Sequence, residues 1–162
     1  AAAVELVNLE RREWRLYDLL RKIRTNYDYI IVDSPPSLGL ITLNGLVAAE
    51  EVIIPVQCEY FALEGLGQLL ETIQLIRDNL GRELKIKGAL LTMYDKRQRL
   101  SQDVVKEVRR NFPGLVFSAV IPRSVMLAEA PSFGKTILQH APLSAGGHAY
   151  GELAQEIISL DK

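Results

Sequence analysis

The sequence predicts an α/β fold, with a mostly parallel β-sheet flanked by helices, and two observations carry that prediction. Continuous runs of β-branched and aliphatic residues recur along the chain, as in strands that are covered on both faces. Helical patterns lie between these runs, as expected where right-handed crossovers connect parallel strands. Since 162 residues suffice for one core and no repeat or long linker divides them, we expect a single α/β domain over residues 1–162.

In chain order, the predicted strands are the apolar runs at residues 29–33, 51–57, 86–93, 116–122 and 136–138. Helices are predicted where apolar residues recur every three to four positions. Gly81 is placed to end the second helix, and Ser101 is the predicted N-cap of the third. The apolar positions of the four helices are Leu16, Leu19, Leu20 and Ile23; Leu63, Leu66, Leu70, Ile73 and Ile76, after Ala62; Val104, Val105 and Val108; and Ala149, Leu153 and Ile157.

Composition and charge exclude several classes of protein. With 48% hydrophobic and 24% charged residues, the chain has the balance of a soluble globular protein rather than a disordered tail. The formal net charge of -1 gives no global attraction to nucleic acid or anionic membrane, so such binding would need a local patch. No apolar run reaches membrane-spanning length, and the single cysteine, Cys58, cannot form a disulfide within the chain. The chain begins at Ala1 without a methionine, which leaves truncation or processing open.

Ligands of parallel α/β sheets bind beyond the carboxyl ends of the strands, so the residues that close each predicted strand form the candidate site. The first run ends in Asp33, whose carboxylate could hold Mg²⁺ directly or through water. Pro35 and Pro36 then keep the chain extended as it leaves the strand. The alternative, in which Asp33 only caps a turn, stays open.

The later strand ends are also polar. Gln57 closes one run, and a plain surface role is its simpler interpretation. The next run closes with Thr92, Met93 and Asp95, and the loop after it carries Lys96, Arg97 and Arg99. These cations form a basic patch suited to phosphate on a ligand or a nucleic acid, although a solvated loop explains them equally well.

The run at 116–122 closes with a proline that could lie against a flat base. After Pro122, Ser124 could hydrogen-bond to the edge of that base, and Arg123 adds a further positive charge. These residues extend the candidate site along the edge of the sheet.

The sequence Gly134-Lys135-Thr136 ends like a phosphate-binding loop, but the rest of the motif G-x-x-x-x-G-K-[ST] is missing. Glu129 stands where the first glycine would be, and Pro131 removes one of the N–H donors. We therefore interpret this stretch as a glycine turn into the short strand 136–138. A metal pair is not indicated by His140 and His148, which are too far apart for one turn of helix.

The stretches "YDYIIVDSPPSLG", "LLTMYDKRQRLS" and "IPRSVMLAEAPSFGKTI" resemble, in order and spacing, the ParA/Soj family of chromosome- or plasmid-partitioning ATPases, in the deviant-Walker group of P-loop proteins. The resemblance runs from Val4 onward and corresponds to the C-terminal two-thirds of that family. It implies a sheet of the P-loop NTPase type without the N-terminal strand and phosphate loop, and hence an N-terminally truncated ATPase domain over residues 1–162.

The resemblance also implies roles for residues at the strand ends. Asp33 matches the Walker B aspartate, which acts on Mg²⁺. Pro122 and Ser124 match positions that contact adenine, although the family usually has asparagine where Ser124 stands, and Met93 belongs to the same expected nucleotide site. The switch region that follows Asp33 contains Ser34, Pro35, Pro36 and Gly39.

Arg97 matches a basic residue associated with sequence-independent DNA binding in the family. Met126 stands where a second arginine is usual, and a neutral thioether cannot pair with phosphate. DNA binding is therefore expected to be weak or to depend on neighbouring cations, namely Lys96, Arg99 and Arg123. The resemblance further implies self-association as a dimer, a ParB-like centromere-binding partner, and a cytoplasmic, nucleoid-associated location.

ATP and Mg²⁺ are the cofactors of the family, whose catalysis needs the lysines and the Ser/Thr of the phosphate loop. That loop is not in these 162 residues, so this chain alone is expected to bind neither cofactor and not to hydrolyse ATP. The alternative is a short non-catalytic paralogue that acts as a partner- or DNA-binding module. A membrane-cycling, MinD-like role is disfavoured because the tail "ELAQEIISLDK" is acidic rather than basic.

Overall fold

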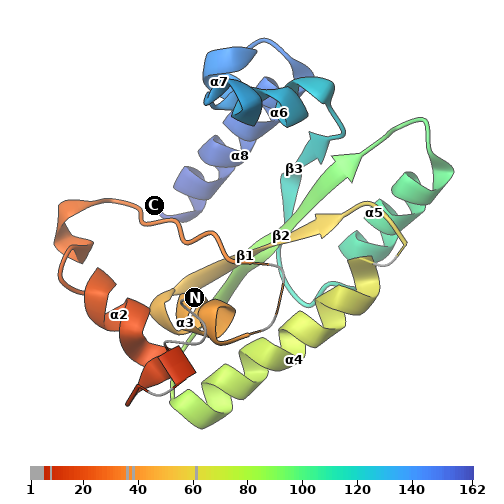
Figure 1. The fold of residues 1–162 in the computed structure, drawn as a ribbon. Helices are drawn as coiled ribbons and strands as arrows, with labels where there is room; N and C mark the ends of the chain where they lie inside the picture. The colour runs from red at the N-terminus through yellow and green to blue at the C-terminus, as the bar shows by residue number, and fades with distance from the viewer. Residues whose placement is uncertain (1–5, 8, 36, 38, 61) are drawn as a thin grey trace. The chain divides into compact units, whose positions relative to one another are not determined.

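Three of the predicted strands are present in the structure, a computed structural model that describes residues 6–7, 9–35, 37, 39–60 and 62–162, with the backbone alone for 62–64. They are β1 (Glu51–Gln57), β2 (Lys85–Tyr94) and β3 (Val116–Pro122). The sheet order is β1-β2-β3, β2 and β3 pair in parallel, and the three arrows point the same way (Figure 1). The predicted parallel sheet flanked by helices is therefore confirmed.

The chain divides into two compact units, each of which is described by itself. The first unit comprises Ala1–Val52 and Gly67–Ile86, and the second comprises Ile53–Leu66 and Lys87–Lys162. Most of the three strands lie in the second unit, with α5 (Arg99–Asn111), α6 (Val125–Glu129), η3 (Ala130–Phe133), α7 (Ile137–His140) and α8 (Ala145–Leu160). In the first unit lie η1 (Arg12–Trp14), α2 (Arg15–Leu20), η2 (Arg24–Asn26), α3 (Leu40–Ala48) and most of α4 (Ala62–Leu80).

The longer helices form where the apolar spacing predicts them. Helix α4 begins at Ala62 and is followed by Gly81 at φ 60°, a left-handed conformation that glycine adopts without steric cost. Helix α8 begins after Ser144, whose side chain accepts a hydrogen bond from the N–H of Gly147 at 3.1 Å. The first helix is shorter than its pattern, because α2 ends at Leu20 and leaves Ile23 outside it. No helix in the described part of the chain is long and apolar enough to cross a membrane.

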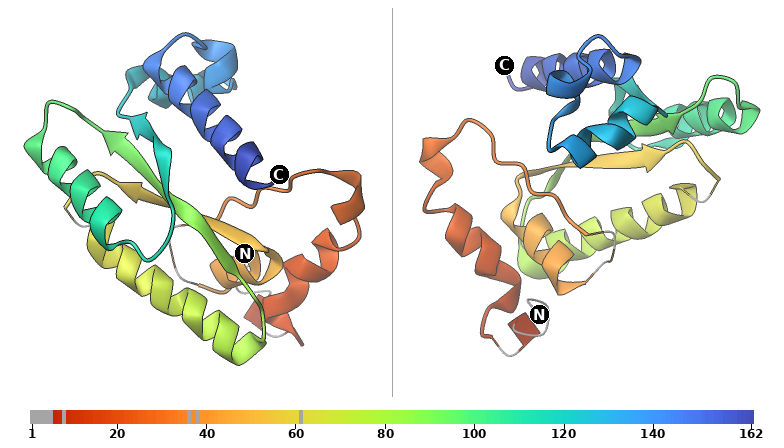
Figure 2. Two further views of the ribbon diagram at one scale, coloured as in Figure 1. Left: turned by 180° about the vertical axis from the view of Figure 1, so that it is seen from behind. Right: turned by 45° about the horizontal axis from the view of Figure 1, so that its top comes forward.

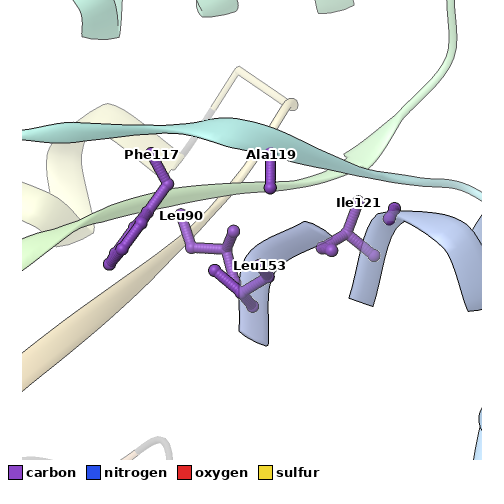
Figure 3. Packing of buried hydrophobic residues seen from close by; sticks show 6 residues of the cluster. Leu90, Phe117, Ala119, Ile121 and Leu153 are labelled. Carbon is purple, nitrogen blue, oxygen red and sulfur yellow. The ribbon is translucent and has the colours of Figure 1, made fainter. Parts of the chain in front are cut away.

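The core of the second unit lies between β3 and α8. Phe117, Ala119 and Ile121 point from β3 toward α8, which contributes Leu153 (Figure 3). Helix α8 packs against β3 and runs beside it in Figure 1 and in the left view of Figure 2. Leu90 of β2 joins this cluster, whereas its neighbours Ala89 and Leu91 are fully buried and alternate to the other face of the sheet. The central strand is thus covered on both faces, as its continuous apolar run predicts.

Strand β3 contains a bulge that α8 stabilises. Ala89 pairs with Val116 and Leu91 pairs with Val120, so β3 has more residues than β2 between the two pairs. The carboxylate of Glu156, on α8, accepts hydrogen bonds from the N–H groups of Ser118 at 2.8 Å and Ala119 at 3.1 Å. The side chain therefore pairs backbone donors that lie in the irregular part of the strand.

Two predicted strands are wrong. Residues 29–33 have no regular secondary structure, and Ile31 is 92% exposed. A strand exists only when a neighbour pairs with its backbone, and the described sheet does not include this run. Residues 136–138 instead start α7, where the Thr136 hydroxyl accepts from the N–H of Gln139 and the Gln139 side chain accepts from the N–H of Thr136. This reciprocal capping favours a helix, although the predicted glycine turn is present, with Gly134 at φ 62°.

A polar residue on α3 links the N-terminal helices of the first unit to α3. Asn44 is 5% exposed, and its amide donates to the carbonyl oxygen of Arg12 at 2.8 Å. Its side-chain oxygen accepts from the N–H of Leu16 at 3.1 Å. Asn44 thereby joins η1 and the start of α2 to α3, and satisfies backbone groups at a helix N-terminus that would otherwise lack partners.

Candidate functional site

The carboxyl ends of the three strands meet in the second unit, as the sequence predicts for the site. The N–H of Cys58, just after β1, donates to the carbonyl oxygen of Thr92 in β2 at 2.9 Å. At the other side of β2, Tyr94 pairs with Pro122, and its carbonyl oxygen accepts from the N–H of Arg123 at 2.9 Å. The ends of β1, β2 and β3 are thus joined through backbone hydrogen bonds.

A second bulge shapes the end of β2. Two residues separate Leu91 from Tyr94 on β2, whereas one residue separates their partners on β3. The extra residue coincides with Met93, whose φ of 56° lies in the left-handed region that residues with a Cβ seldom adopt. Bulges with strained residues are frequent beside functional sites, because they redirect the side chains that follow. Met93, a predicted nucleotide-site residue, is 38% exposed here.

Ser101 connects the loop after β2 to the end of β1. It is 1% exposed, and its hydroxyl accepts from the N–H of Asp95 and donates to the carbonyl oxygen of Cys58, both at 3.2 Å. The predicted N-cap role is wrong, since α5 begins earlier, after Gln98. Burial raises the pKa of the Cys58 thiol above its ordinary value, so this side chain is a poor nucleophile.

Asp95 and Arg97 form a bidentate ion pair at this edge. Nε of Arg97 donates to Oδ1 of Asp95 at 3.0 Å, and Nη2 donates to Oδ2 at 2.9 Å. The backbone N–H of Arg97 also donates to Oδ1, at 3.0 Å. Hydrogen bonds from Arg97 lower the pKa of Asp95 to about 2 and raise that of Arg97 above its ordinary value.

The other cations of the predicted DNA site also lie near the strand ends of the second unit. Arg123 forms an ion pair with Glu59, which follows β1. Arg99 lies 3.8 Å from Asp103, one turn further along α5. Lys96 is exposed, and its carbonyl oxygen accepts from the side chain of Gln102 at 2.7 Å. Arg99 and Arg123 thus each lie beside a carboxylate of the same chain.

The predicted base-binding residues adjoin Arg123. Pro122 ends β3 and is half-buried, and Ser124 precedes α6 without a side-chain capping hydrogen bond. The Ser124 hydroxyl can therefore hydrogen-bond to a ligand. Met126 follows on α6 and is 40% exposed. Gln57 is exposed at the end of β1, in agreement with its surface interpretation.

Asp33 and the switch residues lie in the first unit. Asp33 and Ser34 are exposed, and the hydroxyl of Thr42 on α3 donates to the carbonyl oxygens of Ser37 at 2.6 Å and Pro35 at 3.2 Å. A Cβ added at Gly45 would lie 2.8 Å from Oγ of Ser34, so α3 approaches this segment closely. The hydroxyl of Thr42 therefore fixes the predicted switch segment against α3, and the absence of a side chain at Gly45 lets the segment approach the helix closely. Pro36 lies outside the described residues, and Gly39 immediately precedes α3.

The carboxylates of the candidate site do not form a complete metal centre among the described residues. Among the described residues, no group of three His, Cys, Asp or Glu side chains gathers as metal ligands would. Mg²⁺ in nucleotide sites commonly takes one or two carboxylates and completes its shell with phosphate oxygens and water. The single carboxylate of Asp33 fits the protein part of such a shell, but the sequence holds no complete phosphate-loop motif to position the phosphates.

Three contributors to these sites were not predicted as such. Glu59 pairs with Arg123, Ser101 bridges two strand ends, and Thr42 holds the segment after Asp33. No local sequence pattern marks Glu59, because its partner Arg123 lies 64 residues away. None marks Thr42 either, because its partners are backbone carbonyls, which every residue has. Ser101 is expected from the sequence to cap the helix, but it lies inside the first turn of α5 and bonds to Asp95 and Cys58 instead.

A family model described as an AAA domain matches residues 1–86 of this chain. The chromosome partitioning protein ParA of Myxococcus xanthus is 52% identical over 160 residues, which cover 99% of this chain and 56% of that protein. The sporulation initiation inhibitor protein Soj of Bacillus subtilis is 51% identical, over 96% of this chain and 62% of its own length. The chain spans less than two thirds of the length of these relatives.

Solved structures show the same fold. Cobyrinic acid a,c-diamide synthase from Mycobacterium smegmatis matches with a TM-score of 0.82 at 37% identity, covering 99% of this chain and 59% of its own. The same enzyme with bound ADP and magnesium matches with a TM-score of 0.79, covering 98% and 57%. The cell division ATPase MinD of Pyrococcus furiosus, at 23% identity and a TM-score of 0.70, covers 91% and 59% and shares the fold.

Proposed function

The chain belongs to the ParA/Soj family of AAA-domain proteins, and from that premise we propose that it carries the base-binding and DNA-contacting part of a partitioning ATPase. In this proposal Pro122, Ser124 and Met93 contact the nucleotide base, and Asp33 acts on Mg²⁺. The segment with Ser34, Pro35, Pro36 and Gly39 is the switch that follows it. The complete protein would form ATP-dependent dimers on nucleoid DNA in the cytoplasm and respond to a ParB-like partner.

The meeting of the three strand ends in the second unit carries this proposal. The carboxyl edge of a parallel sheet is where α/β proteins bind their ligands. At this edge the bulged Met93 and the last residue of β3 are neighbours through the pairing of Tyr94 with Pro122. Arginines stand beside them, and guanidinium groups are suited to phosphate on a nucleotide or on DNA.

Without a phosphate loop, this chain alone is proposed not to hydrolyse ATP. Transfer of the γ-phosphoryl group requires cations and N–H donors around the phosphates, and Asp33 alone supplies neither. Phosphate release from Mg·ATP should equal the buffer background, with the full-length chromosome-partitioning ATPase Soj of Treponema pallidum as the active control. Release by this chain at the rate of the control would contradict the proposal.

DNA contact can be tested on the chain as it stands. Fluorescence anisotropy with a short duplex of random sequence should detect weak, salt-dependent binding. Arg97→Gln should weaken it for every sequence and reduce the salt slope by about one, as expected for a lost phosphate contact. Arg110→Gln, on an exposed arginine in the last turn of α5, is the matched control and should change binding less.

A second candidate is a non-catalytic module that binds DNA or a partner without nucleotide. The replacement of a basic residue by the exposed Met126 favours it, because a nucleotide-switched clamp would use cations there. Since this chain alone is expected not to bind ATP, a chimera separates the two candidates: the phosphate-loop region of the chromosome-partitioning ATPase Soj of Treponema pallidum is joined before residue 1, and the anisotropy assay is repeated with ATP and Mg²⁺. Unchanged affinity of the chimera supports the module, whereas tighter binding with ATP supports the nucleotide-dependent partitioning protein.

A further inference from the structure

Three of the four cations predicted for DNA contact are paired with carboxylates of the same chain. Arg123 pairs with Glu59, Arg99 with Asp103 and Arg97 with Asp95. The pairs differ in geometry. Arg99 makes one long contact of 3.8 Å, whereas Arg97 uses two N–H groups of its guanidinium on both oxygens of Asp95.

We propose that Asp95 masks Arg97, because its carboxylate occupies the two guanidinium N–H groups with which Arg97 would otherwise bind an external phosphate. This inference rests on the proposed DNA contact and adds a residue that limits it. A planar guanidinium binds carboxylate and phosphate through the same pair of parallel N–H groups, so the two anions compete directly.

The carboxylate is fixed and the arginine is accessible. The Asp95 side chain is 11% exposed, and its backbone N–H is held by the buried hydroxyl of Ser101. The backbone N–H of Arg97 adds a third donor to the same carboxylate. The Arg97 side chain is 84% exposed, so a phosphate group can approach it from solvent. Asp95 is therefore a competitor for Arg97 that belongs to the chain itself and is held beside the guanidinium in the absence of DNA.

The strength of the pair permits competition rather than permanent closure. Ion pairs at exposed arginines are weak in water, so phosphates on DNA can displace the carboxylate. Asp95 then sets the affinity and the salt dependence of binding without abolishing it. The low pKa of Asp95 keeps the carboxylate charged over the whole physiological range, so the mask does not depend on pH there.

Asp95→Asn is the direct test, since asparagine removes the charge, keeps one oxygen acceptor and replaces the other by an NH₂ group that cannot accept from the guanidinium of Arg97. Asp103→Asn is the matched control, with the same charge change on a carboxylate that makes only one long contact to Arg99. Affinity for a short random duplex would be measured over a series of salt concentrations, with circular dichroism to verify folding. The double variant Asp95→Asn with Arg97→Gln tests whether the gain passes through Arg97.

We expect Asp95→Asn to bind about tenfold tighter at about 50 mM salt, with a salt slope steeper by about one, as for one added phosphate contact. Asp103→Asn should gain much less, and the double variant should lose the gain. Equal affinities for the wild type and Asp95→Asn, with Arg97→Gln weaker, would overturn the mask and leave the DNA contact intact. Equal gains in Asp95→Asn and Asp103→Asn would also overturn it. Absence of binding by every variant would overturn both the mask and the proposed DNA contact.

Discussion

Residues 28–33 and residues 88–95 each carry an aliphatic run that closes on an aspartate, but their surroundings differ. The run that ends at Asp95 is the central strand β2, bonded to neighbours on both sides. The carboxylate of Asp95 accepts hydrogen bonds from Arg97, and its backbone N–H donates to the hydroxyl of Ser101. The run that ends at Asp33 has no regular secondary structure, and its Ile31 is 92% exposed.

An apolar run specifies a preference for burial, whereas the neighbouring segments decide whether it forms a strand. In β2, backbone groups find partners in β1 and β3, and side chains on alternate faces are buried. The run at 28–33 has the same preference and no paired neighbour in the described sheet. Sequence signals of equal quality therefore lead to a paired strand in one case and to an exposed segment in the other.

Truncating a buried apolar side chain to alanine should change the free energy of unfolding most, and truncating an exposed one should change it little. Phe117 is fully buried between β3 and α8, so Phe117→Ala should lower the free energy of unfolding by about 3–5 kcal/mol. Ile31→Ala should change it by no more than about 0.5 kcal/mol, because little apolar surface is lost. Urea denaturation measures both. Comparable losses would mean that 28–33 is buried in solution, and the contrast between the runs would fail.

A smaller effect is expected for the hydroxyl groups that hold the two segments. Ser101→Ala leaves the N–H of Asp95 and the buried carbonyl of Cys58 without their partner, and should cost about 1–3 kcal/mol. Thr42→Val should cost less than about 1 kcal/mol, because the carbonyls of Pro35 and Ser37 belong to exposed residues that water can reach. The same denaturation experiment ranks them, and the reverse order would refute this account of the two segments.

The smallest effect concerns acid. Since the folded pKa of Asp95 is depressed to about 2, its contribution to stability is fully present above its unfolded value of about 4 and is lost as pH falls toward 2. Carboxyl chemical shifts followed by NMR should give the low value for Asp95. Arg97→Gln should move it upward, because the main cause of the shift is removed. A titration near 4 in the wild type would show that the Asp95–Arg97 pair is not formed in solution.

The sequence predicts the sheet well because β1, β2 and β3 are all buried runs of sufficient length between helices. It predicts the carboxyl edge as the site because parallel strands place all their ends there. It does not distinguish Ser101 as an N-cap from Ser101 as a bridge, since its acceptor, the carbonyl of Cys58, lies 43 residues away. The spacing of Thr136 and Gln139 is typical of a helix capping box, but the β-branched residues Thr136 and Ile137 also favour a strand, so the sequence alone does not decide between them.

The Glu156 carboxylate on α8 has a consequence for how this fold can change during evolution. It accepts from the N–H groups of Ser118 and Ala119, in the bulge of β3. Removing the bulge would return those N–H groups to regular strand positions and leave a charged group against the sheet. Replacing Glu156 alone would leave the bulge donors without an acceptor. We therefore expect β3 and α8 to tolerate change only together, as one inherited unit.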